Sequence, residues 1–437
     1  EIERAPKLQT ACTVLVQPGM VVRTSTPQVH EARKGMLEFL LTNHPLDCPV
    51  CDKGGECELQ DMTFRYGAAT SRFVEIKEHE PEQRFSPVVY FDAPRCILCF
   101  RCVRVCDEAM DVKALGVAQR GVRSTIIPNR PDGSLQCEEC GMCVDICPVG
   151  ALLPGAYRYK TRPWEVKYVS TPCAHCGDGC KTTLSVRHHE LIRANNRDKS
   201  GVNGDFLCIK GRYAFDFVSF PERLKEPLVR RDGKLEPASW HDALRTVATR
   251  LQEVLERAGP TAVGFIGSNH TTNEENYLLQ RFARTVVGTN NLDHHRTADY
   301  AALASALAGD AARLARTRDL TQAGAILLIG NDPTHNHPLL AYNIRAAVRQ
   351  QGAHLYIVNH RWVKLERQAR QIVRVPAGGE STAVELLLDQ PASLPPDARE
   401  GLASLRAALE KEKDVVVLFG AELTGTARLL FVPVLPG

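Results

Sequence analysis

The chain has 437 residues, of which 54 are Lys or Arg and 51 are Asp or Glu, so its formal net charge is only +3. This near balance gives no reason to expect nucleic acid or an anionic membrane surface as a partner. The length predicts two to four domains, and no apolar run reaches the roughly 18 residues that would predict a membrane-spanning helix.

The start of the chain and its cysteines indicate the kind of protein. The first residues, from Glu1 to Lys7, contain no export signal and no initiator Met, so we expect the chain to begin partway into a longer protein. All sixteen cysteines lie between Cys12 and Cys208. Disulfide frameworks belong to short secreted chains, whereas these cysteines have metal-ligand spacing. We therefore expect metal-binding thiolates in a reducing, cytoplasmic compartment, and a second half without thiolate chemistry.

A segment with apolar residues near helical spacing, 29–41, precedes a loop rich in proline, glycine and cysteine. The possible ligands in this loop are His44, Cys48, Cys51 and Cys57. The prolines and glycines favour a tight loop that can fold around a metal. A neutral imidazole in place of one thiolate makes an iron–sulfur cluster less negative and should change its potential. Three Cys and one His are also compatible with zinc.

Two cysteine runs follow, each with the x2-x2-x3 spacing of bacterial ferredoxins, and the second run ends in Pro148. In such pairs the fourth cysteine of each run ligates the cluster of the other run. The first expected ligand set is Cys96, Cys99, Cys102 and Cys147. The second expected set is Cys137, Cys140, Cys143 and Cys106. Zinc sites also use x2 spacing, but three cysteines at x2-x2 in duplicate are poor zinc geometry.

A third spacing class follows, Cys173-x2-Cys176-x3-Cys180, with Cys208 further along. Between them, 186–192 has the pattern of a hairpin that returns the chain to the metal. Zinc stays open as the metal for this group. Cys12 remains ungrouped, and buried free cysteines are common.

From Trp240 onward, apolar strands alternate with helical patterns. The expected elements lie at 262–266, 274–287, 325–329, 339–349 and 355–358. This rhythm predicts a parallel, doubly wound sheet. No G-x-G-x-x-G and no G-x4-G-K-[ST] opens a helix, so no dinucleotide or triphosphate site is expected. The fold class is therefore multidomain, first α+β and then α/β.

The loop from Thr42 to Met62 closely resembles the His/Cys cluster loop of the large iron–sulfur subunit of respiratory complex I, the NADH:quinone oxidoreductase. The run Asp145–Leu152 and the motif Arg162-Pro163-Trp164-Glu165 are also similar to that subunit. The resemblance is distinctive over about the first 220 residues and weaker beyond them.

The resemblance implies a plant-type ferredoxin domain with a [2Fe-2S] cluster, of which Cys12 matches the last ligand and the other ligands precede Glu1. It implies four [4Fe-4S] clusters on the four groups above. It also implies a domain series, in chain order: 1–28, the remnant of the [2Fe-2S] ferredoxin domain; 29–88, the His/Cys cluster domain; 89–160, a 2[4Fe-4S] ferredoxin-like domain; 161–225, a [4Fe-4S] domain like the N-terminal part of molybdopterin oxidoreductases; and 226–437, the α/β molybdopterin-oxidoreductase-like domain.

The chain departs from typical complex I subunits in keeping the group of Cys106, Cys137, Cys140 and Cys143. In this respect it is similar to the α subunits of NAD-dependent formate dehydrogenases and to iron-only hydrogenases. We therefore expect one cluster more than the usual complex I set.

The α/β half resembles the molybdopterin oxidoreductases at 208–212, 273–277 and 288–293. In formate dehydrogenases of that family, a Cys or selenocysteine that ligates the metal follows soon after, but residues 294–300 contain no Cys. Asp299 is a possible substitute ligand. In molybdenum enzymes Lys210 would bridge cluster and pterin, whereas here we expect an ordinary packing role. We therefore expect no molybdopterin.

The resemblance implies an electron-relay subunit of the peripheral arm, with iron as its metal and no catalytic residue of its own. It would pass electrons from NADH toward quinone, with the Cys173 cluster off the path. The implied partners are the NADH/FMN-binding subunit, the [2Fe-2S] subunit and the 2[4Fe-4S] subunit, on the cytoplasmic side of the inner (plasma) membrane. The alternatives are the α subunit of an NAD-dependent molybdenum formate dehydrogenase and a zinc-stapled scaffold.

Overall fold

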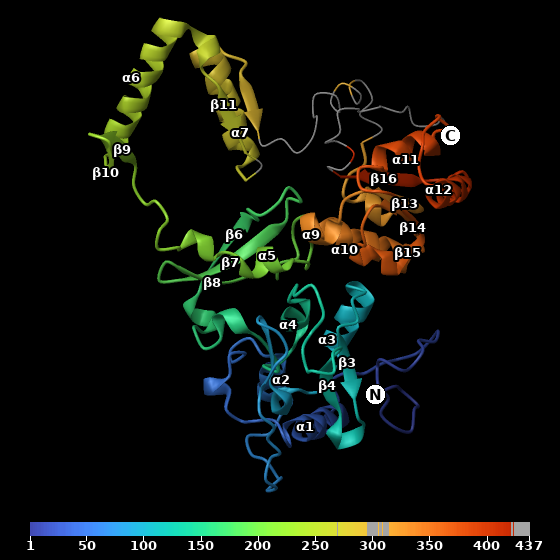
Figure 1. Ribbon diagram of the computed structural model, residues 1–437. Coiled ribbons are helices and arrows are strands. Elements are labelled where there is room, and N and C mark those ends of the chain that lie inside the picture. Colours follow the sequence, from blue (N-terminus) through green and yellow to red (C-terminus); the bar gives the residue numbers. More distant parts are fainter. Residues whose placement is uncertain (269, 295–304, 306–307, 309–313, 421–422, 424–437) are drawn as a thin grey trace. The chain divides into compact units, whose positions relative to one another are not determined.

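The computed structural model describes residues 1–268, 270–294, 305, 308, 314–420 and 423, which form two compact units (Figure 1). The first unit contains Glu1–Val169 and Thr183–Asn195, and the second contains Ser170–Thr182 and the chain from Asn196 onward. The chain therefore passes between the units after residues 169, 182 and 195. Within the described ranges, no helix has the length and apolar character needed to cross a membrane.

The first unit begins with the helix that the sequence predicts. Helix α1 spans Pro27–Leu41, and the Thr26 hydroxyl caps it by accepting a hydrogen bond from the Val29 backbone N–H (3.3 Å). A proline at the first helical position is well tolerated because its missing N–H would have no partner there. Helix α2, Glu58–Tyr66, starts directly after Cys57 and packs against α1. The helix pair therefore brackets the proline- and glycine-rich loop.

The rest of the first unit combines short strands with two short helices. Strand β2 (Val89–Phe91) lies between β1 (Gln83–Arg84) and β5 (Leu152–Pro154), and β3 (Leu115–Ala118) pairs with β4 (Thr125–Pro128). Helix α3 (Arg101–Arg104) continues into a π-helical turn at Val105–Ala109, and helix α4 spans Met142–Ile146. One apolar core joins these elements to α1 and α2. Its members include Leu37, Leu59, Phe85, Leu115 and Leu152.

The hairpin expected around 186–192 is confirmed. Strand β7 (Lys181–Arg187) pairs antiparallel with β8 (Glu190–Asn195), and β6 (Lys167–Pro172) completes the three-stranded order β6-β7-β8. His188 and His189 form the two-residue turn, and both have positive φ, 47° and 67°. Positive φ at both central residues is the geometry of a tight hairpin turn that matches strand twist.

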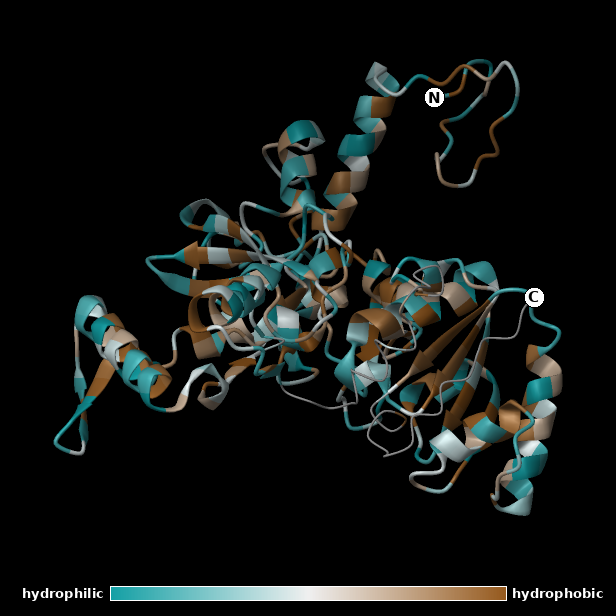
Figure 2. Ribbon diagram, turned by 90° about the horizontal axis from the view of Figure 1, so that it is seen from above, coloured by the Kyte–Doolittle hydropathy of each residue, from teal (hydrophilic) through white to brown (hydrophobic). Residues whose placement is uncertain are grey.

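The second unit contains the parallel sheet that the α/β pattern predicts. Its strand order is β15-β14-β13-β16, and all neighbours are parallel. The strands are β13 (Ala325–Ile329), β14 (His354–Asn359), β15 (Ala369–Arg374) and β16 (Val415–Phe419). Every residue of β13 is buried, as expected for a central strand covered on both faces. In Figure 2 much of this sheet is brown, the hydrophobic end of the scale.

Helices cover both faces of this sheet. Ile326 and Leu328 of β13 lie in one core with Ile344 of α10 (Pro338–Ala346). Leu327 and Ile329 lie in a second core, with Ala383 of α11 (Glu380–Leu387) and Leu402 of α12 (Pro396–Leu409). Alternate residues of the strand therefore enter opposite cores, which is the period of a β-strand.

The remaining elements of the second unit lie mainly before this sheet. They are α5 (Ile209–Tyr213), β9 (Leu228–Arg231), β10 (Lys234–Pro237), α6 (Trp240–Ala258), β11 (Phe265–Gly267), α7 (Asn273–Phe282), β12 (Leu292–His294) and α9 (Pro333–Asn336). The strand expected at 262–266 corresponds to β11, which begins later, at Phe265. The expected helix at 274–287 corresponds to α7 and a π-helical turn at Ala283–Val287. Strands β11 and β12 pair parallel to one another.

Candidate metal centres

Four cysteines from both ferredoxin-like runs line one cavity of the first unit. They are Cys96, Cys99, Cys102 and Cys147. Cys102 lies on α3, and Cys147 directly follows the last residue of α4. The remaining lining is apolar and includes Phe91 and Ile126. The first three cysteines of one run therefore meet the fourth cysteine of the other run.

The complementary four cysteines line a second cavity. They are Cys106, Cys137, Cys140 and Cys143. Cys106 lies in the π-helical turn after α3, and Cys143 lies on α4. Helices α3 and α4 contact one another, and each carries a cysteine of one cavity and leads into a cysteine of the other. The grouping of sulfurs is the exchanged one that the spacing predicts.

The two runs have the same backbone conformation. Leu98 and Glu139, each two residues after the first cysteine of its run, have φ of 51° and 50°. Each donates its backbone N–H to that cysteine's sulfur, Leu98 to Cys96 (3.4 Å) and Glu139 to Cys137 (3.2 Å). Non-glycine residues in this left-handed region are strained, and such strain is concentrated at functional sites. The backbone conformation of each loop therefore directs an amide N–H toward the sulfur of its first cysteine.

The sulfurs of these cavities need a positive charge to be ionised together. Burial raises the pKa of the Cys96 thiol to about 11 and that of Cys102 to about 12, and the neighbouring Cys147 and Cys99 add to both rises. Burial likewise raises the pKa of Cys143 far above its usual value. Metal binding releases the protons and supplies the missing charge. The donor sets thus fit cysteine-ligated iron–sulfur clusters, and the amides fit a role in stabilising thiolate sulfur.

The His44 loop contains the third group. Cys48 opens a short 3₁₀ turn (Cys48–Val50), Cys51 follows it, and Cys57 precedes α2. The His44 side chain is buried, and burial, with a further contribution from the charge of Arg95, lowers the pKa of this imidazole to about 4. The ring is therefore neutral at pH 7. Its Nδ1 is buried and has no hydrogen-bond partner among the described residues, which fits a nitrogen that binds a metal.

The motif Arg162-Pro163-Trp164 holds this loop in shape. The Arg162 guanidinium donates to the backbone carbonyls of Pro49 and Cys51. Gly55 has a φ of +91°, and a Cβ at this position would lie 2.5 Å from the Trp164 ring. The loop therefore requires a glycine here both for its backbone conformation and for the close approach of the ring. Sequence reasoning identified this motif by resemblance but did not predict its contacts.

Arg95 joins the His44 loop to the first ferredoxin-like run. Its guanidinium binds both oxygens of Asp47 at 2.7 Å, and its Nε binds Asp92 at 2.7 Å. Asp47 immediately precedes Cys48, and Arg95 immediately precedes Cys96. Bidentate Arg–carboxylate pairs fix geometry as well as charge. This pair therefore ties together the loops of two ligand groups. The sequence shows no signal for it because the partners are far apart in the chain.

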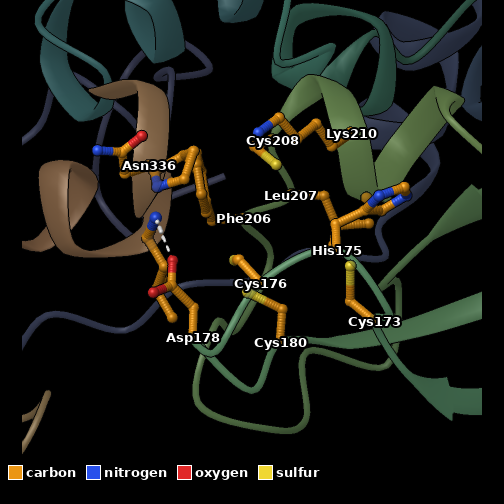
Figure 3. A pocket seen from close by; sticks show the side chains of 13 residues that line it. Cys173, His175, Cys176, Asp178, Cys180, Phe206, Leu207, Cys208, Lys210 and Asn336 are labelled. Carbon is orange, nitrogen blue, oxygen red and sulfur yellow. Dashed lines mark hydrogen bonds between the residues drawn. The ribbon is translucent and has the colours of Figure 1, made fainter. Parts of the chain in front are cut away.

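The fourth group lies in the second unit (Figure 3). The cavity there is lined by Cys173, Cys176, Cys180 and Cys208. The Cys173 backbone N–H donates to the Cys180 carbonyl (2.8 Å), which closes the loop between β6 and β7. Cys208 immediately precedes α5. The Figure 3 view shows the four side chains arranged around the same space.

An acid–histidine pair beside this cavity was not predicted. Asp178 accepts a hydrogen bond from the Leu339 backbone N–H (3.1 Å) and lies 2.8 Å from His337 Nδ1. Hydrogen bonds to Asp178 and to Cys176 raise the pKa of His337 to about 9. The pair holds the start of α10 against the cysteine loop. Lys210 Nζ lies 3.5 Å from the His335 carbonyl oxygen, which agrees with a packing role.

Two residues considered as ligands lie apart from these groups. Cys12 is exposed and lines none of the three cysteine cavities. Asp299 lies outside the described residues. The sequence has no cysteine after Cys208, so no thiolate is available to a metal in the α/β half.

Family models match most of the chain. Residues 33–72 match the NADH-ubiquinone oxidoreductase-G iron-sulfur binding region, and residues 86–153 match the ferredoxin-like domain of NADH-quinone oxidoreductase subunit 3. Residues 166–219 match the molybdopterin oxidoreductase Fe4S4 domain, and residues 223–388 match molybdopterin oxidoreductase. The chain is therefore multidomain, with ferredoxin-like iron–sulfur regions followed by a molybdopterin-oxidoreductase-type α/β domain.

Several curated proteins are similar over most of this chain. The NADH-quinone oxidoreductase G 2 subunit of Rhizobium meliloti is 40% identical over 390 residues, 88% of this chain and 45% of the relative. The alpha subunit of the NADPH-Fe(3+) oxidoreductase of Geobacter sulfurreducens is 34% identical, covering 89% and 46%. The NADH-quinone oxidoreductase G subunit of Streptomyces coelicolor is 32% identical, covering 98% and 52%. The chain spans about half the length of these relatives, and the predicted resemblance is confirmed.

Gly150 leaves space for the Cys51 sulfur, and its replacement by alanine tests whether the His44 loop holds a cluster. A Cβ at Gly150 would lie 2.5 Å from Cys51 Sγ, so the sulfur must move. We expect Gly150→Ala to lower the iron content by about four atoms per chain, the share of one [4Fe-4S] cluster, as measured by iron analysis. Gly116→Ala is the control, because its Cβ would have only a contact of 4.0 Å to Ile127. Equal iron contents of the two variants would contradict the assignment.

Proposed function

The chain is related over most of its length to the G subunits of NADH-quinone oxidoreductases, and we propose that it is the iron–sulfur electron relay of such an enzyme. Electrons from NADH, oxidised in a partner subunit, pass along its clusters toward quinone. The observation that carries this proposal is the exchange of fourth cysteines between two cavities, because paired ferredoxin clusters use this exchange.

The proposed ligands are the four groups described above, each holding one [4Fe-4S] cluster. The first two sets are Cys96, Cys99, Cys102, Cys147 and Cys106, Cys137, Cys140, Cys143. The other two are His44, Cys48, Cys51, Cys57 and Cys173, Cys176, Cys180, Cys208. Cys12 is proposed as the last ligand of a [2Fe-2S] cluster, whose other ligands belong to a segment before Glu1.

When bound, the clusters supply one-electron redox chemistry, with potentials anywhere between roughly −700 and +450 mV. The residues of the chain hold the clusters, exclude water and set their potentials. The apolar lining around Cys102 lowers the local dielectric, and the amides of Leu98 and Glu139 stabilise negative charge on sulfur. The neutral imidazole of His44 makes its cluster less negative than an all-cysteine cluster.

The five segments predicted from the sequence are proposed as domains, at 1–28, 29–88, 89–160, 161–225 and 226–437. The last is proposed as a scaffold without molybdopterin, because no cysteine follows Cys208 and Lys210 lies against a backbone carbonyl. The proposed partners are the NADH/FMN-binding, [2Fe-2S] and 2[4Fe-4S] subunits of the peripheral arm. The proposed location is the cytoplasmic side of the plasma membrane.

A second candidate function has support from one relative. The similarity to the alpha subunit of NADPH-Fe(3+) oxidoreductase covers 89% of the chain, so the same relay could serve an enzyme that oxidises NADPH and reduces Fe(3+). The clusters are the same in the two proposals, and the donor and acceptor differ. Reduction of the clusters in the intact complex by NADH but not by NADPH or formate favours the first proposal.

Metal analysis of the purified complex tests the relay. We expect about 16 iron atoms in the four [4Fe-4S] sites of this chain, an equal amount of acid-labile sulfide and no molybdenum. Visible absorption should bleach with dithionite. Stoichiometric molybdenum would favour formate dehydrogenase, and zinc without dithionite-bleachable absorption would favour a zinc-stapled scaffold.

The second ferredoxin-like cluster is tested by Cys140→Ser. We expect the variant to lose about four iron atoms per chain and one [4Fe-4S] signal in EPR spin counting of the fully reduced protein. Cys12→Ser is the control because Cys12 lines none of the cysteine cavities, and it should keep all four [4Fe-4S] signals. A Cys140→Ser protein with full iron would exclude this cluster.

Histidine ligation is tested by His44→Cys. The variant should keep its iron, because a thiolate can replace the imidazole as a ligand. The added negative charge should lower the potential of this cluster alone, as measured by EPR-monitored redox titration. Identical titration curves of the variant and the original protein would show that His44 is not a ligand.

A further inference from the structure

The β3–β4 hairpin joins the two ferredoxin-like cysteine runs, and its sequence is basic. The chain between Asp111 and Asp132 contains no Asp or Glu. Its basic residues are Lys113, Arg120, Arg123 and Arg130. This short stretch therefore concentrates positive charge, although the net charge of the whole chain is only +3.

The hairpin ends in a tip, residues 119–124, that has a defined backbone conformation. Its 3₁₀ turn spans Gly121–Arg123, and the Ser124 backbone N–H donates to the Gly121 carbonyl (3.1 Å). Gly121 has a φ of 64°, which glycine adopts without strain. The tip is therefore held by its own backbone, so a partner that binds there would not have to order it.

Three side chains of the tip are exposed to solvent. They are Arg120, Arg123 and Val122, and the valine is 89% exposed. Neither arginine forms an ion pair with any residue that the structure describes. Arginine is enriched in protein–protein interfaces, where a polar rim surrounds apolar contacts. The tip therefore combines unpaired positive charge with an apolar contact point.

The arginines of the neighbouring helix, in contrast, are neutralised. Helix α3 contacts β3 (Figure 1), and its Arg101 binds Glu58 at 2.7 and 2.9 Å. Arg104 binds Glu108 at 2.8 and 3.0 Å. Attraction of a negatively charged partner from a distance depends on charge that is not neutralised locally. At this side of the first unit, the tip supplies such charge and α3 does not.

The other end of the hairpin forms walls of both ferredoxin-like cavities. Ala114, directly before β3, lines the cavity of Cys106 and donates its backbone N–H to the Cys106 sulfur (3.2 Å). Ile126 of β4 lines the cavity of Cys96. Ala118, the last residue of β3, lies about 13 Å of strand beyond Ala114, at about 3.3 Å per residue. The hairpin therefore links the surface to both cavities by a short path.

We propose that the hairpin tip is the docking site of an acidic one-electron carrier protein, which delivers electrons to the clusters in the cavities of Cys96 and Cys106. The inference rests on the proposed function, because these clusters are the electron acceptors. In each encounter the reduced carrier loses one electron and one oxidised cluster gains it, and no bond or proton is transferred. The two arginines attract the negative surface of the carrier, and Val122 packs against an apolar group on it.

A docking site at the tip has a consequence for the relay. In the proposed function, electrons from NADH enter through a partner subunit. A carrier at the tip instead reaches the paired ferredoxin-like clusters of this chain directly, because one hairpin forms both the tip and part of the cavity walls. The relay can then accept electrons from two different donors.

The test mixes the intact, oxidised complex with a reduced plant-type [2Fe-2S] ferredoxin of negative net charge. Rapid-freeze EPR follows the [4Fe-4S] signals at about 10 mM salt, where charges act over roughly 30 Å. We expect Arg120→Gln/Arg123→Gln to lower the second-order rate constant about tenfold, because electrostatic steering raises association rates by about 10- to 1000-fold. Arg257→Gln/Arg281→Gln is the matched control. It removes the same charge from exposed positions on α6 and α7 and should keep the original rate.

Each outcome decides the inference. Equal rates of the two double variants, or no reduction of the clusters by ferredoxin, would overturn it. Loss of partner subunits from the Arg120→Gln/Arg123→Gln complex would show that the tip is a subunit contact, which also overturns it. NADH and reduced methyl viologen, a small carrier that needs no docking site, should reduce the clusters equally in all three proteins. If neither reduces them in the original protein, the proposed function itself fails, and this failure is distinct from a failure of docking.

Discussion

The first unit depends on the crowding of sulfur atoms in buried cavities. Four thiol groups that line one apolar space cannot all ionise without added positive charge, since burial and mutual repulsion both raise their pKa values. The exchange of Cys106 and Cys147 between the two cavities means that neither cavity can form alone. Helices α3 and α4 must pack together for either set of sulfurs to meet. Packing of the helices and completion of the metal sites are therefore one event.

The ligand loops contain little regular secondary structure, and side-chain charges from distant segments hold them. Arg162 binds the carbonyl of Pro49 within the His44 loop's 3₁₀ turn and that of Cys51 directly after it, and Arg95 binds Asp47 directly before the turn. Glu56 forms a buried ion pair with Arg193 of β8, at 2.7 and 2.8 Å. Breaking a buried pair by removing one partner is strongly destabilising. A loop anchored in this way has a fixed shape, which the proposed relay needs because the distances between its clusters must not vary.

Local sequence was sufficient to predict which cysteines line the three cavities, helix 29–41 and the strands β13 and β14 of the parallel sheet, because spacing and periodicity are local properties. Strand β15 was not predicted. Strand β13 occupies the predicted 325–329. The pairs Arg95–Asp47 and Asp178–His337 could not be predicted, because nothing in the sequence relates residues that only the fold brings together.

The three passages of the chain between the two units, after residues 169, 182 and 195, affect how the protein can be synthesised and divided. The first unit is not complete until Asn195 has left the ribosome, although most of its residues precede Val169. By then residues 170–182, which carry three cysteines of the last group, have been synthesised. The rest of the second unit, to which they belong, has not. No single cut separates the units, so a protease acting between residues 170 and 195, or a gene truncated there, would damage both.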